Sequence, residues 1–171
     1  MAFLALAASC AAAGDPRLRE EFSRRAIASI AVGEVKNAGG EIRLPAAGLF
    51  KALFSGKPAQ PEERRALEAV ETAVRGFLYG RGFGGTAPPG KGEATLDVEV
   101  TLFDARRLPD RREARFGGRF RLRDARSGET LWEKEIAGRT VSGIHTARAD
   151  DFEPYVERFV RDALRDLPAR R

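Results

Sequence analysis

The sequence contains a single cysteine and a single histidine, and it lacks a long apolar run. One cysteine cannot form an internal disulfide, so no such bond can staple the fold. One histidine excludes a zinc site built from several histidines. The longest apolar stretch, residues 1–14, is shorter than the about 20 residues that a transmembrane helix needs. These scarcities exclude disulfide-stapled scaffolds and histidine-rich metal sites.

Charged residues are abundant, but the two signs are mixed. The chain has 30 Lys and Arg against 25 Asp and Glu, for a formal net charge of +5 at pH 7. Because the signs are interleaved, the pattern is typical of a solvated surface rather than of a nucleic-acid-binding face. Hydrophobic residues make up 43% of the 171 residues, which is enough for one core and predicts one domain.

The apolar N-terminus ends in small residues around the lone cysteine. Its length is that of the hydrophobic region of a secretory signal peptide. The segment Ala7-Ala8-Ser9-Cys10 resembles the lipobox of bacterial lipoproteins. That resemblance implies that residues 1–9 are a signal peptide and that Cys10 becomes a lipidated N-terminus, followed by a short linker over 10–25. Ala11, where Asp would imply inner-membrane retention, implies the outer membrane. The alternative is a soluble protein with a frayed N-terminus and an incidental cysteine.

Residues 26–168 are predicted to form the single domain, from their hydrophobic periodicity. The predicted strands and helices are each apolar on one face only, and this pattern predicts a two-layer α+β sandwich. Its sheet would be mainly antiparallel, with about four strands, and two amphipathic helices would cover one face. We expect strands at 26–35, 94–103, 114–123 and 130–141, helices at 61–78 and 150–167, and a turn at 37–40. The order is strand-helix-strand-strand-strand-helix.

Charges are expected to pair across the outer face of the second and third strands. The strand over 94–103 alternates strictly, with Leu96, Val98, Val100 and Leu102 facing the core. Its outer face would hold Asp97 and Glu99, opposite arginines of the next strand. Those arginines are Arg115, Arg119, Arg121 and Arg123. Alternatively, Arg115, Arg119 and Arg121 contact anionic lipid or an acidic partner.

A short helix is expected within residues 45–58. Its apolar residues would form one stripe, which either packs in the core or forms a patch for a partner or a lipid. The stripe consists of Leu49, Phe50, Leu53 and Phe54.

The segment from Asp124 to Trp132, DARSGETLW, resembles a hairpin of small bacterial envelope lipoproteins. Together with the LDVEVTLF strand over 96–103, the layout resembles the auxiliary lipoproteins of ABC-type lipid transport, the PqiC-like group. The TolB N-terminal and curli-secretion lipoproteins have a related layout. The resemblance implies a non-catalytic accessory subunit on the periplasmic face of the outer membrane, with another envelope protein as its partner and no cofactor.

Motifs for catalysis and nucleotide binding are incomplete. Gly80-x-Gly82-x-x-Gly85 follows a predicted helix rather than a strand, and the P-loop-like segment 85–92 lacks its Ser or Thr. Ser142, His145 and Asp150 share one loop without a G-x-S-x-G elbow. We therefore expect no enzyme activity, nucleotide, nucleic acid or metal. The alternatives are a binding module for envelope lipid or glycan, with a cavity between helices and sheet, and a hydrolase using the loop 139–150.

Overall fold

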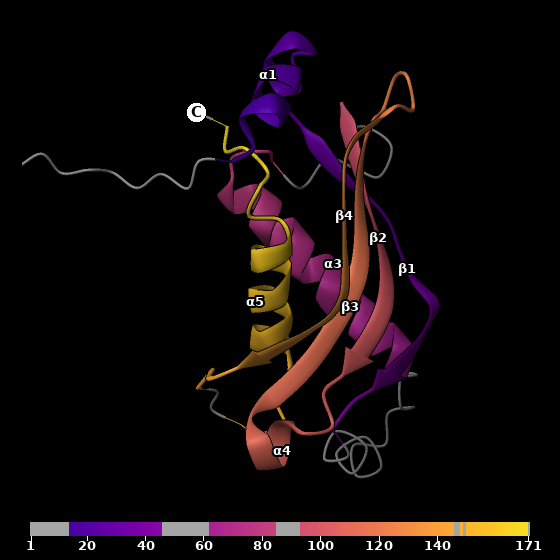
Figure 1. Cartoon of the computed structure of the whole chain (residues 1–171), viewed down its shortest axis with the longest axis vertical. Helices are drawn as coiled ribbons and strands as arrows, with labels where there is room; N and C mark the ends of the chain where they lie inside the picture. The colour runs from indigo at the N-terminus through magenta and orange to yellow at the C-terminus, as the bar shows by residue number, and fades with distance from the viewer. Residues whose placement is uncertain (1–13, 46–61, 85–92, 146–147, 149, 171) are drawn as a thin grey trace, which may run out of the picture.

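The computed structural model describes residues 14–45, 62–84, 93–145, 148 and 150–170. Its elements are α1 (Pro16–Arg24), β1 (Ile30–Arg43), α3 (Glu62–Gly80), β2 (Ala94–Asp104), α4 (Leu108–Arg111), β3 (Glu113–Asp124), β4 (Thr130–Ser142) and α5 (Glu153–Ala163) (Figure 1). The strands form one sheet in the order β1-β2-β3-β4. β1 is parallel to β2, and the other neighbours are antiparallel.

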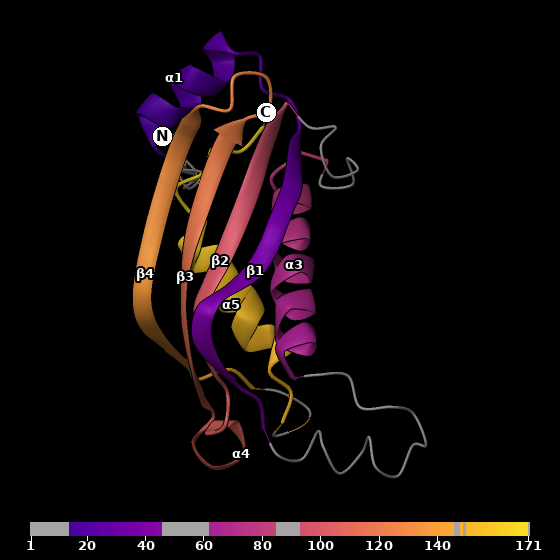
Figure 2. The same ribbon diagram turned by 90° about the vertical axis from the view of Figure 1, so that its right-hand side faces the viewer.

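Helices α3 and α5 cover one face of the sheet. Figure 2 shows the four strands in front, with α5 behind them and α3 alongside β1. This arrangement confirms the predicted α+β fold with two helices on one face. None of the helices in the described part of the chain is long and apolar enough to cross a membrane.

The first strand is longer than its sequence pattern predicts. The predicted turn at 37–40 is wrong, because β1 continues through it to Arg43. The pairing with β2 shifts register between Asn37 and Glu41, and Gly39 adopts a φ of +81°. The Asn37 side-chain oxygen accepts a hydrogen bond from the Gly40 backbone N–H at 2.8 Å. The turn-forming residues therefore make a bulge inside the strand instead of ending it.

The inward faces of β2 and β3 meet the helices through aromatic rings. Phe103 and Phe116 pack edge to face with centroids 5.0 Å apart, and Phe116 stacks on Phe159 of α5 at 5.3 Å. A register shift after Val100 turns Phe103 inward, so the prediction that Leu102 faces the core is wrong. The binding-module hypothesis expected a cavity between helices and sheet, and these rings occupy that space.

Helix α1 belongs to the same core, although the sequence pattern places the domain boundary at residue 26. Leu18 and Phe22 are buried in the core cluster, and Phe22 packs against Phe83 at 5.6 Å. Arg25, just after α1, donates hydrogen bonds to Asp124 at 3.0 Å and to Glu129 at 2.6 Å. These bonds tie α1 to the β3–β4 hairpin.

The space around two glycines, Gly40 in the β1 bulge and Gly76 in α3, predicts opposite effects of substitution by alanine. A Cβ on Gly40 would lie 2.1 Å from the Thr101 carbonyl oxygen, whereas no atom lies within 4 Å of one on Gly76 in α3. We expect Gly40→Ala to lower the free energy of unfolding by about 1–3 kcal/mol, because the backbone must move. Gly76→Ala should raise it by about 0.5–1 kcal/mol. Urea unfolding measures both, and equal effects would contradict the bulge.

The hairpin bonds predict an acid-dependent loss of stability. Asp124 accepts hydrogen bonds from the backbone N–H groups of Ser127 and Arg126, at 3.0 and 2.8 Å. With the Arg25 bond, they lower the pKa of Asp124 to about 2. A lowered folded-state pKa gives stability that is present above the unfolded pKa and lost as the pH falls through the folded one. We expect Asp124→Asn to lower Tm at pH 7, with the difference from wild type shrinking between pH 4 and pH 2.

Thermal unfolding followed by circular dichroism from pH 2 to pH 7 checks this expectation. Asp110→Asn, at an exposed position of α4, is the matched control and should leave Tm unchanged at each pH. A Tm difference for Asp124→Asn that stays constant across this range would contradict the assignment.

Candidate functional site: the groove between α3 and α5

A groove runs between α3 and α5 on the solvent side of the helix layer. It has two hollows, of about 290 and about 550 Å³. Both are lined by Thr72, Ala73 and Glu157, so the hollows adjoin, and together they are called the α3–α5 groove below. The lower hollow lies toward the first turns of both helices, and the upper hollow lies toward their last turns.

Small residues on α3 leave room for the groove. Ala69, Ala73, Gly76 and Gly80 are spaced so that they lie along one side of the helix. With no long side chain there, α3 and α5 leave a hollow between them at the surface. The groove is not among the features predicted from the sequence, although the spacing of the small residues is a signal for it.

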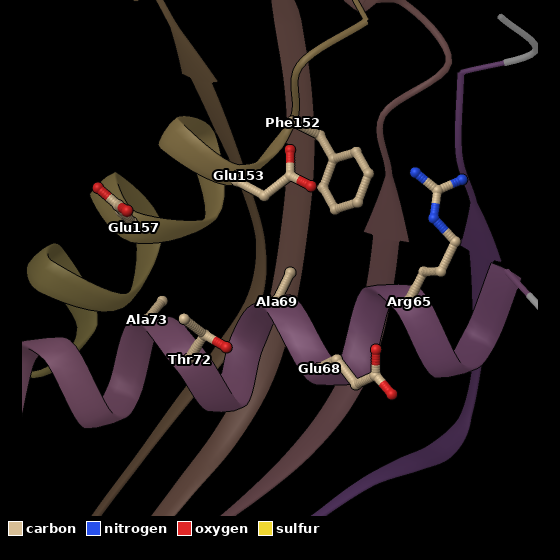
Figure 3. A pocket seen from close by; sticks show the side chains of 8 residues that line it. All are labelled: Arg65, Glu68, Ala69, Thr72, Ala73, Phe152, Glu153 and Glu157. Atoms are coloured by element: carbon tan, nitrogen blue, oxygen red, sulfur yellow. The ribbon is translucent and has the colours of Figure 1, made fainter. Parts of the chain in front are cut away.

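The lower hollow combines an aromatic ring, one arginine and several carboxylates. The guanidinium of Arg65 lies over the Phe152 ring, 5.6 Å from its centroid. Figure 3 shows Glu153 beside this ring and Glu157 projecting from α5. Partial burial, together with the neighbouring Asp151 carboxyl, raises the pKa of Glu153. This end of the groove therefore carries an acidic excess.

The upper hollow is basic. Arg81 lies over the Phe77 ring, 5.1 Å from its centroid, and Arg161 lines the same hollow. Glu157 and Arg161 are exposed and one turn apart on α5, yet neither has an ion-pair partner among the described residues. The groove thus offers unpaired charges of both signs beside apolar surface, which suits the binding of another surface.

The charged outer face of the sheet is occupied by its own ion pairs. Arg119 contacts Glu135 at 3.0 Å, and Arg121 contacts Glu133 at 3.3 Å. The predicted cross-strand pairs are confirmed by contacts of Arg119 with Glu99 at 3.5 Å and of Arg123 with Asp97.

The other predicted contact residues fall in two groups. Arg115 is exposed and has no ion pair within the described part of the chain. The lipidation residue and the apolar stripe lie outside the described residues: Cys10, Leu49, Phe50, Leu53 and Phe54.

The loop of the hydrolase hypothesis is only partly described. His145 Nδ1 lies 3.3 Å from the Arg112 guanidinium, and among the described residues no hydrogen bond joins it to Ser142. Residues 146, 147 and 149 of this loop are outside the described part. Within the described ranges, no group of three His, Cys, Asp or Glu side chains is placed to hold a metal ion.

Comparison with known proteins identifies the fold. No protein-family model matches the sequence, and no curated protein matches it. The structure resembles that of a PelC dodecamer from Paraburkholderia phytofirmans, with a TM-score of 0.52 and 17% identity, over 84% of this chain and 89% of that chain. For a point variant of that PelC, the TM-score is 0.53 at 18% identity, over 84% and 88%. At these identities, the likeness establishes a shared fold.

The raised pKa of Glu153 predicts a stabilising substitution. A folded state that holds the proton more tightly than the unfolded chain loses stability as the pH rises through the raised pKa. We therefore expect Glu153→Gln to raise Tm at pH 7 and to change it less at pH 4, where most of the carboxyl is protonated in the unfolded chain as well. Its place in the first turn of α5 opposes this effect through the helix dipole.

Thermal unfolding at pH 4 and pH 7 measures the two differences. Glu20→Gln, at an exposed position of α1, is the matched control and should give no such pH dependence. A lower Tm for Glu153→Gln at pH 7 would show that the dipole interaction outweighs burial.

Proposed function

We propose that this protein is a lipoprotein of the bacterial cell envelope, acting as a non-catalytic accessory subunit of an assembly that transports lipid. Acyl chains on Cys10 would hold it on the periplasmic face of the outer membrane. Its task would be tethering: the domain is kept at the membrane surface, where it docks another envelope protein.

The observation that carries this proposal is the position at which the chain enters the fold. The Asp15 backbone N–H donates a hydrogen bond to the Asp166 carbonyl oxygen at 2.9 Å, and its side chain caps α1. Gly14 is buried against the backbone of Asp166 to Pro168. Four residues lie between Cys10 and Asp15, and the five residue steps span at most about 18 Å when extended. A lipid on Cys10 would therefore keep this end of the domain close to the bilayer.

The comparisons support the assembly part of the proposal. The PelC structures that share this fold are dodecamers, so the fold is suited to multi-subunit assemblies. The choice of lipid transport depends on the hairpin from Asp124 to Trp132 and the strand over 96–103, which resemble those of the PqiC-like lipoproteins.

If the protein is anchored by a lipid, the lipid must be attached through the Cys10 side chain. We expect the protein, expressed in a Gram-negative host with its genomic upstream sequence, to be found in the membrane fraction. Its intact mass should match a chain that starts at Cys10 and carries acyl groups. Cys10→Ala should remove both the added mass and the membrane association, because alanine has no thiol to bond to the lipid.

Ser9→Ala is the matched control, since it keeps the thiol and a small residue before it, and it should leave the modification intact. An unmodified protein in the soluble fraction that retains residues 1–9 would overturn the proposal.

A further inference from the structure

The upper hollow of the α3–α5 groove lies beside an isolated aromatic side chain. Tyr79 is 71% exposed. Among the described residues, no other large hydrophobic side chain is exposed. Tyr79 follows Thr72, which lines the hollow, by two helical turns, so both residues lie on the same side of α3. A tyrosine ring presents a large contact area at a small cost in conformational entropy, and such rings are enriched at interfaces.

We propose that the α3–α5 groove is a self-association surface, in which Tyr79 of each copy enters the upper hollow of a second, antiparallel copy. A two-fold axis at Gly76 would bring Tyr79, three residues after it, to the level of Ala73 of the partner copy, on the side of the helix where the partner's Thr72 lines the hollow. The surface is open at the axis itself, because a Cβ on Gly76 would meet no atom within 4 Å. An interface of this kind is self-complementary, since each contact occurs twice.

The charges of α5 fit the same axis. Glu157 and Arg161 line the upper hollow and have no ion pair within the described residues. Antiparallel packing about a point midway between them brings Glu157 of one copy to Arg161 of the partner copy, and the reverse pair forms by symmetry. Two α5 helices that faced each other in parallel would instead place like charges together, which opposes association. Charge complementarity therefore selects a second copy in the antiparallel orientation.

The experiment uses the full chain with Cys10→Ala, so that self-association is measured without a lipid anchor and a failed anchor proposal leaves this test intact. Sedimentation velocity from about 1 to 100 μM should show a reversible dimer of twice the 18.7 kDa chain mass. Tyr79→Ser should raise the dimer Kd at least about tenfold. Glu20→Arg, at an exposed position of α1, is the matched control and should leave the Kd unchanged.

The charge variants test the symmetry of the contact. Glu157→Arg and Arg161→Glu should each raise the Kd at least about tenfold. An equimolar mixture of the two variants should form a heterodimer, because each arginine then meets a glutamate of the partner. The double variant, Glu157→Arg with Arg161→Glu, should associate like the wild type. Unchanged circular dichroism spectra establish that each variant is folded.

Two results would overturn the proposal. The first is a protein that stays monomeric over the whole concentration range, which would leave the groove to a ligand or a different protein. The second is a dimer whose Kd responds neither to Tyr79→Ser nor to the charge variants, which would place the contact on another surface.

Discussion

The structure depends on the burial of one face of β2 and β3, and the parallel pairing of β1 with β2 determines how that is achieved. Parallel neighbours cannot be joined by a tight hairpin, so the chain must return along one face of the sheet before the second strand begins. Helix α3 makes this return and packs on the inward face. The antiparallel β3 and β4 then return the chain to the same face, where α5 packs beside α3. The groove is a consequence of this arrangement.

Local patterns were sufficient to predict the elements whose two faces differ sharply. The alternation along β2 and β3 predicts both strands and places Asp97 and Glu99 on the same side as the arginines of β3. Helix periodicity likewise predicts α3 and α5. These predictions succeed because the period of a side-chain pattern is a property of one segment alone. They fail where the partner strand decides, as at the bulge that turns Phe103 inward in place of Leu102.

The candidate site was less accessible from the sequence, for a related reason. The small residues of α3 form a visible pattern, but the pattern does not say which element lies opposite. Only the packed structure brings Glu157 and Arg161 of α5 beside Gly76 and Gly80. The arginine row of β3 was a stronger signal in the sequence, yet Arg119 and Arg121 are used in ion pairs within the sheet. What matters for binding is whether a charge is left unpaired, and tertiary structure decides that.

The two proposals together constrain how the protein would lie on a membrane. Asp15 is fixed to the segment after α5, so a lipid on Cys10 would attach at the end of the molecule where both long helices finish. An antiparallel pair has these ends on opposite sides of its two-fold axis. Both lipids can reach the same bilayer only if that axis stands along the membrane normal. The helices would then lie parallel to the membrane surface, with one edge of the sheet facing the lipid and the other available to a partner.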